Sequence, residues 1–176
     1  MPPSERADSQ IVRFYRGDSA DTRGRTLEDV LAWDDGQLEA VHDYIQWLFP
    51  LDEPSRFNPD APLLTPADRL AFRHEPLAAN LRRALDRMLA FYGLRFDPSD
   101  RRPHIVRSSA WNDRSPHWLQ PGNHNLLRLS RIIRSLTLLG QPDLAAAVYG
   151  VLKKECEGRV SAVTLGYWKE ATDADS

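Results

Sequence analysis

The chain has 176 residues, of which 41% are hydrophobic and 27% charged, with a net charge of −2. These values fit one globular domain with a substantial core. The single cysteine, Cys156, excludes an intramolecular disulfide, and no stretch approaches the ~20 apolar residues of a membrane-spanning helix. The first ten residues lack the apolar run of a signal peptide, so the sequence predicts a cytoplasmic protein.

Charge is distributed unevenly along the chain. Residues 1–60 contain 13 acidic residues and 6 arginines, a net charge of −7. Residues 101–134 contain 7 arginines and one aspartate, a net charge of +6. The two regions could face each other in the fold, or the basic region could bind an anionic partner. The chain has 20 arginines and 3 lysines, a bias that can arise from genome composition and is weak evidence for nucleic-acid binding.

The chain begins with a polar stretch. Residues 1–10 predict a flexible tail, and Ile11 to Tyr15 predict a short extended or irregular segment. Thr26, with an aspartate three residues later, predicts the capped start of a short helix over residues 27–33.

The next apolar pattern predicts a central helix. It begins near Asp34 or Asp35 and stops at Pro50, which lacks a backbone N–H. One face of this helix contains Leu38, Val41, Ile45, Leu48 and Phe49. Trp47 points away from that face, beside Asp43, so either a second helix or a ligand should cover it. His42 and Gln46 lie at the edge of the apolar face, as a buried hydrogen-bonded pair or as part of a site.

Two proline-rich stretches predict long loops. Residues 50–64 contain four prolines and residues 95–122 contain another four, and proline lacks the N–H that helices and strands use. We expect Trp111 and Trp118 to pin the second loop to the core. No alternating pattern of useful length predicts a strand.

The remaining helices are predicted from capping residues and apolar stripes. They cover residues 66–74, 76–92, 124–139 and 142–157, followed by a short helix after Ser161 and a flexible tail over residues 171–176. The predicted fold class is all-α, a single compact multi-helix domain over residues 11–170 with two long proline-rich loops. We expect the helices at residues 38–49 and 124–139 to form its centre, because they have the widest apolar faces.

The helix predicted for residues 124–139 also has a basic stripe. Opposite its main apolar face lie Arg128, Arg131 and Arg134, with His124 near the first two. Because the helix is apolar on nearly every side, we expect some of these arginines to be partly buried and paired with carboxylates such as Asp43 or Glu39.

The sequence shows no motif for catalysis or for a cofactor. It contains no glycine-rich phosphate loop and no nucleotide fingerprint. His104, His117 and His124 fit no common zinc spacing, and no Ser-His-Asp or Cys-His arrangement can be argued from spacing. We therefore predict no catalytic residues, no metal site and no cofactor.

Several blocks of the chain resemble the opioid growth factor receptor conserved region. The most specific block is HDYIQWLFPL, His42 to Leu51, followed by Glu53 and Pro54. The blocks PLLT at residues 62–65, MLAFYG at residues 88–93 and the stretch from His124 to Gly140 follow in the family's order. The resemblance covers about residues 13–155, and the compact, arginine-rich chain is similar to a bacterial member.

The resemblance implies an all-helical domain without a known catalytic activity. The family's animal members are receptors for an endogenous opioid peptide, associated with the nucleus and with inhibition of cell growth. We therefore expect a non-catalytic module that binds a peptide or protein partner. Two alternatives remain: an enzyme with an unrecognised site near His42, Asp43 and His124, or a nucleic-acid-binding protein that uses the Arg-rich 101–134 region, through Arg101, Arg102, Arg107, Arg114 and Arg128.

The candidate ligand site is a groove between the two predicted central helices. The first helix supplies Asp43 and Trp47, with His42 and Gln46 at the edge, and the second supplies His124, Arg128 and Arg131. An aromatic wall with a few convergent polar groups is typical of a ligand pocket. For a peptide, Asp43 would receive the amine, Trp47 would stack on an aromatic side chain and Arg128 would bind a carboxylate. In the alternative, the same residues form a closed salt-bridge network under a covering loop.

Overall fold

The computed structural model describes residues 8–174, and helices form most of its regular structure. The helices are α1 (Gln10–Arg16), α2 (Leu27–Leu31), α3 (Asp35–Ala40), α4 (Ile45–Leu48), α5 (Pro66–Ala71), α6 (Leu77–Tyr92), α7 (Trp111–Trp118), α8 (His124–Leu138), α9 (Pro142–Cys156) and α10 (Ala162–Glu170). The strands are β1 (Leu94–Phe96) and β2 (Ile105–Arg107). The predicted all-α class is confirmed, apart from this small sheet. No helix within residues 8–174 combines the length and the apolar character needed to span a membrane.

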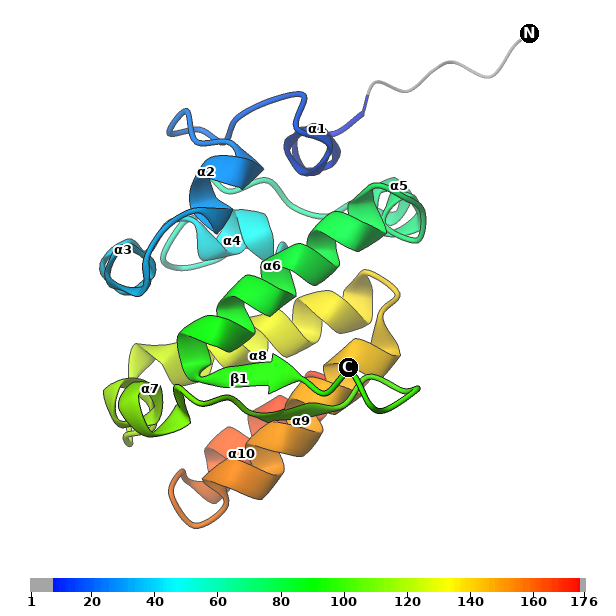
Figure 1. Ribbon diagram of the computed structural model, residues 1–176. Helices are drawn as coiled ribbons and strands as arrows, with labels where there is room; N and C mark the ends of the chain where they lie inside the picture. The colour runs from blue at the N-terminus through cyan, green and yellow to red at the C-terminus, as the bar shows by residue number, and fades with distance from the viewer. Residues whose placement is uncertain (1–7, 175–176) are drawn as a thin grey trace, which may run out of the picture.

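Helices α6 and α8 cross the middle of the molecule in Figure 1. On one side α1 and α2 pack against α6, and on the other side α9 and α10 pack against α8. The strand β2 contacts α9, and α7 contacts both α6 and α8. One cluster of buried apolar side chains extends from α1 to α10. The predicted centre is therefore half right, because α8 is central but α6 takes the place expected for the residue 38–49 helix.

Side-chain caps start several helices at the predicted residues. Thr26 and Thr65 each form a reciprocal capping box with an aspartate three residues later. Helix α6 ends at Gly93, whose φ is 78°. A Cβ on Gly93 would lie 2.8 Å from the Cα of Trp111. Glycine is therefore required here both for the left-handed conformation and for the close approach of α7.

Buried tryptophans attach the C-terminal elements to the core. Trp118 of α7 donates its indole N–H to the Tyr92 carbonyl at 3.1 Å, and Trp168 of α10 donates to the Leu126 carbonyl at 3.1 Å. The rings of Trp111 and Trp118 meet edge to face, with centroids 5.9 Å apart. The predicted anchoring by Trp111 and Trp118 is confirmed.

The segment predicted to be extended or irregular, Ile11 to Tyr15, is helical. The Ser9 hydroxyl caps α1 by accepting the Val12 N–H at 3.2 Å, and Gly17 ends the helix with a φ of 84°. The prediction failed because seven residues are too few for apolar spacing to distinguish a helix from a strand.

The predicted tails lie partly outside the described residues, namely residues 1–7 and 175–176. Within the range that the structure describes, Ser9 belongs to the cap of α1. Ala171 is buried, and its carbonyl accepts a hydrogen bond from the Thr137 hydroxyl at 2.7 Å.

The single helix predicted over residues 38–49 is divided into α3 and α4. Between them Val41 is extended, with φ −94° and ψ 133°. The buried guanidinium of Arg128 donates to the carbonyls of Leu38 and Val41, each at 2.9 Å. In a continuous helix these two oxygens would accept the N–H groups four residues later. A side chain from α8 therefore replaces local helical hydrogen bonds and fixes the break.

The stretch predicted as a second loop, residues 95–122, contains a hairpin and a helix. Strands β1 and β2 pair antiparallel with Arg95 opposite Val106, and α7 follows with Pro116 inside it. Strands of three residues are too short to show an alternating pattern, so the prediction of no strand was wrong. The other predicted loop, residues 50–64, has no helix or strand, as expected.

Candidate binding cleft

A cleft of about 620 Å³ opens between the chain around α4 and the helices α8 and α10. One wall comes from the segment that contains α4 and the loop after it: His42, Ile45, Gln46, Leu51, Asp52, Glu53, Ser55, Arg56 and Phe57. The opposite wall comes from α8 and the C-terminal helix: His124, Leu127, Arg128, Ser130, Arg131, Arg134, Tyr167, Glu170 and Ala171. The cleft thus combines apolar, basic and acidic side chains.

Five of the seven residues predicted for the ligand site line this cleft: His42, Gln46, His124, Arg128 and Arg131. Trp47 does not, because its side chain is 2% exposed and packs on Phe14 of α1, with ring centroids 5.3 Å apart. Asp43 also lies elsewhere and forms ion pairs with Arg25 at 2.8 Å and Arg23 at 3.1 Å. Helix α1 and the loop after it therefore cover the side chains of Trp47 and Asp43, which were predicted to face either a second helix or a ligand.

Arg128 lies at the inner end of the cleft, but its donors are occupied. Besides two backbone carbonyls, its guanidinium contacts Nδ1 of His42 at 3.2 Å. Of the three α8 arginines, some of which were expected to pair with carboxylates, Arg128 is buried but binds carbonyls and neutral side chains. Glu39 instead accepts a hydrogen bond from Asn125 at 3.0 Å and lies 3.2 Å from Nε2 of His124.

His42 and His124 meet edge to face in the cleft, with ring centroids 5.3 Å apart. Nδ1 of His42 faces the Arg128 guanidinium and so acts as an acceptor. The pKa of His124 is lowered, mainly by burial and also by the nearby Arg128 and His42. The carboxylate of Glu39 opposes this shift only in part. Within residues 8–174 no hydroxyl or thiol hydrogen-bonds to either ring, and no group of three or more His, Cys, Asp or Glu is arranged to hold a metal ion.

Arg131 and Gln46 form a second polar group on the cleft floor. Arg131 donates to the Phe49 carbonyl at 3.0 Å. Burial lowers the pKa of Arg131 to about 10, although Glu53 raises it. Gln46 is 3% exposed, its amide nitrogen reaches the Ser55 hydroxyl only at 3.4 Å, and its Oε1 has no hydrogen-bond partner among residues 8–174.

Three large apolar side chains on the rim of the cleft are exposed to solvent. Phe57 is 75% exposed, and Leu127 and Tyr167 are each 57% exposed. Sequence reasoning did not assign these residues to the site. The available signal was the position of Leu127 among the arginines of α8, since an apolar residue on a charged face indicates an interaction surface.

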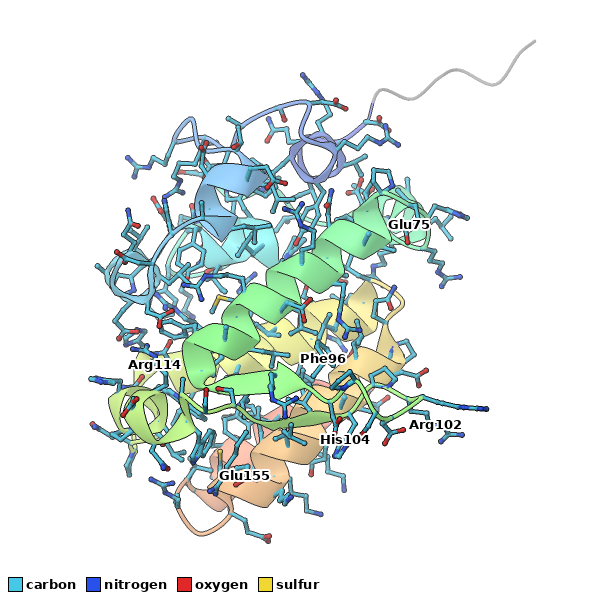
Figure 2. All side chains as sticks on the ribbon, viewed as in Figure 1. Glu75, Phe96, Arg102, His104, Arg114 and Glu155 are labelled. Atoms are coloured by element: carbon cyan, nitrogen blue, oxygen red, sulfur yellow. The ribbon has the colours of Figure 1, made fainter. Side chains whose placement is uncertain are left out.

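Three of the five arginines considered for nucleic-acid binding are engaged within the fold. Arg107 pairs with Glu155 at 2.6 Å, Arg114 pairs with Asp35 at 3.4 Å, and Arg128 is buried. In Figure 2, Arg114 lies beside the end of α6 and Glu155 lies on α9. The contact of Arg114 with Asp35 joins the basic and acidic regions, so these contacts do not favour a nucleic-acid partner.

The chain matches the protein family described as "Opioid growth factor receptor (OGFr) conserved region" over residues 4–165. It belongs to this family. The opioid growth factor receptor of Mus musculus is 39% identical over 135 residues, which cover 73% of this chain and 21% of the receptor. The Homo sapiens receptor is 38% identical over 139 residues, covering 76% and 20%. Opioid growth factor receptor-like protein 1 of Mus musculus is 36% identical over 140 residues, covering 76% and 29%.

The chain therefore spans less than a third of the length of these opioid growth factor receptor relatives. No solved structure matches it. Two of the sequence blocks that resemble the opioid growth factor receptor conserved region face each other in the fold. The block from His42 to Leu51 supplies one wall of the cleft, and the block from His124 to Gly140 supplies the other.

Proposed function

We propose that this chain is a non-catalytic module that binds a peptide, or a peptide segment of a partner protein, in the cleft. The observation that carries the proposal is a concave site with exposed apolar side chains on its rim and buried polar groups on its floor. Its volume of about 620 Å³ lies within the usual range for ligand sites. Exposed apolar groups gathered around a concavity are typical of interaction surfaces.

The relatives support the same class of function. Their names describe receptors for an opioid growth factor, and a receptor needs a binding site. The inference from them is an analogy, because the chain covers only part of each relative. Two sequence blocks typical of the family form opposite walls of the cleft. This arrangement supports the cleft as the binding site.

A displayed library of random linear peptides, selected on the immobilised protein, tests the proposal. We expect enrichment of peptides with at least one aromatic or aliphatic side chain, because the rim offers Phe57, Leu127 and Tyr167. Binding of synthetic versions should then be measured by fluorescence anisotropy. A selection that yields no peptide above the background of an unrelated protein would contradict the proposal.

A matched pair of leucine variants locates the site. Leu127 on the cleft rim and Leu70 on α5 are similarly exposed, at 57% and 58%. Leu127→Ser should weaken binding of the selected peptides roughly five- to tenfold, because it removes apolar surface that the peptide covers. Leu70→Ser should bind like the unsubstituted protein. Equal effects of the two substitutions would place the binding surface elsewhere.

A further inference from the structure

The floor of the cleft contains a cation, Arg131, that forms no ion pair within residues 8–174. Among these residues, the Phe49 carbonyl is its one hydrogen-bond acceptor. We propose that the cleft recognises a carboxylate next to an apolar or aromatic side chain, with Arg131 as the anion-binding group and Gln46 as the partner of an adjacent amide. This inference rests on the proposed peptide-binding function.

Other arginines with limited exposure show how this fold usually treats a guanidinium. Arg25 binds the carboxylates of Asp21 and Asp43. Arg87 binds Asp35 together with a backbone carbonyl. Arg128 binds two carbonyls and three side chains. Compared with these arginines, Arg131 has fewer hydrogen-bond acceptors. Because a guanidinium has two parallel N–H donors that match a carboxylate, a ligand carboxylate could supply the missing acceptor.

Gln46 is the second, independent sign of a ligand. Its side chain is almost fully buried, yet Oε1 has no hydrogen-bond partner within the part of the chain that the structure describes. A buried polar atom without a partner is costly, so this oxygen requires a donor from outside the described residues. A peptide N–H next to the bound carboxylate would satisfy this oxygen.

The two groups border the same part of the cleft floor. Gln46 and Arg131 line the main cleft and also border a small recess of about 10 Å³ beside it. Groups that share so small a recess can both reach one planar carboxylate–amide unit. Phe57 and Tyr167 on the rim then lie where the neighbouring side chain of the ligand would pack.

The acidic residues of the cleft favour a carboxylate over a phosphate. Asp52, Glu53 and Glu170 also line the walls. Their negative charges would repel a dianionic phosphate more strongly than a singly charged carboxylate. One guanidinium is enough to neutralise one carboxylate. Arg131, which forms no ion pair within residues 8–174, is such a guanidinium on the cleft floor.

Three small probes separate the possible sources of the carboxylate. N-acetyl-glycyl-phenylalanine has a terminal carboxylate, N-acetyl-glutamyl-phenylalaninamide has a side-chain carboxylate, and N-acetyl-glutaminyl-phenylalaninamide has none. Titration of the ¹⁵N-labelled protein, followed by amide and side-chain NMR shifts, should show that at least one acidic probe binds tenfold or more tightly than the neutral one. The tighter acid identifies a chain terminus or a side chain as the source.

The inference is overturned if the neutral probe binds as tightly as both acids, or if neither acid binds up to roughly 20 mM. It is also overturned if inorganic phosphate binds more tightly than either acid. These results are distinct from failure of the proposed function, which would leave the peptide library without any enriched sequence. If library peptides bind equally well as free acids and as neutral amides, the carboxylate preference is contradicted and the peptide-binding function is retained.

Two substitutions connect the preference to the floor residues. Arg131→Gln should abolish the difference between acidic and neutral probes, whereas Arg101→Gln, which removes an exposed cation outside the cleft lining, should retain it. If Arg131→Gln fails to fold, Gln46→Glu provides the test, because it places a carboxylate beside Arg131 within the protein. Gln46→Glu should raise the melting temperature and abolish binding of the acidic probe. A lower melting temperature with unchanged acid binding would contradict the assignment.

Discussion

Arg128 has a structural role that its residue type does not suggest. Its guanidinium satisfies the carbonyls of Leu38 and Val41 at the break between α3 and α4. Removing it leaves the Val41 carbonyl without a donor among residues 8–174, whereas the Leu38 carbonyl keeps the Tyr44 hydroxyl at 3.0 Å. It also removes the charge-assisted bonds that hold the segment to α8. The side chain expected to bind a ligand carboxylate is therefore part of the fold.

We predict that Arg128→Gln lowers the free energy of unfolding by about 2–4 kcal/mol. Arg128→Lys should recover only part of this loss, because one ammonium group lacks the fork that spans two carbonyls. Urea unfolding followed by circular dichroism measures both. Arg56→Gln is the control, expected within about 0.5 kcal/mol of the unsubstituted protein. Full stability of Arg128→Lys would contradict the need for a forked donor.

Asp43 makes the stability depend on pH. Burial raises the pKa of its carboxyl group, but the hydrogen bond and charge of Arg25, together with the charge of Arg23, lower it by more. Because the folded pKa lies below the ordinary value of 3.8, the stabilisation is present above about pH 4 and is lost as the pH falls through the folded pKa.

Asp43→Asn should therefore destabilise the protein by about 1 kcal/mol at neutral pH, and the difference should shrink toward zero below about pH 4. Melting temperatures of both proteins across this pH range measure the effect. Asp60→Asn, at an exposed position in the 50–64 loop, should show no such pH-dependent difference. A constant gap between Asp43→Asn and the unsubstituted protein at all pH values would show that the ion pairs are not its cause.

At the scale of elements, long amphipathic helices could be predicted and short elements could not. Helices α6, α8 and α9 have apolar stripes over fifteen or sixteen residues, α8 begins at the Asn123 cap and α6 ends at Gly93. These local signals dominate their conformation. The seven-residue α1 packs on α5 and α6, and the three-residue β2 packs on α9, which are contacts between distant parts of the chain. Single-sequence patterns contain no record of such contacts.

Helix α8 offers a direct test of the core. Ile133 on this helix is fully buried, whereas Leu127 is 57% exposed. Ile133→Ala should lower the free energy of unfolding by about 2–5 kcal/mol, as buried large-to-small substitutions do. Leu127→Ala should change it by less than about 0.5 kcal/mol. Denaturant unfolding of both variants measures the difference, and similar values for the two would mean that α8 is peripheral.

At the scale of the whole molecule, one apolar cluster joins the two sides of the fold. Trp47 packs with α1 on one side and Trp168 joins α10 to α8 on the other. Because the cluster is continuous from α1 to α10, we expect a single cooperative unfolding transition.

Variants that lack one tryptophan test this cooperativity. In Trp47→Phe the fluorescence reports more on the C-terminal side, and in Trp168→Phe more on the N-terminal side. Within each variant, the fluorescence and circular dichroism midpoints in urea should coincide. A fluorescence midpoint displaced from the circular dichroism midpoint in either variant would indicate two units that unfold separately.

The candidate cleft shows which parts of a site a sequence reveals. Helical spacing placed His42 and Gln46 on one element and His124 and Arg131 on another, and these residues do line one cleft. Trp47 was assigned to the cleft because no pattern identified α1 as its cover. The cleft rim was missed because Phe57 lies in a loop, where no periodicity defines the direction of a side chain.

The break between α3 and α4 also has a consequence for the order of folding. The contacts that fix it join residues 90 and 87 positions apart in the chain, whereas the local pattern of this segment favours one continuous helix. Local structure forms faster than contacts between distant residues. The segment should therefore pass through a straight helical form and bend only when α8 docks. Arg128 would then act mainly by slowing unfolding, with little effect on the rate of folding.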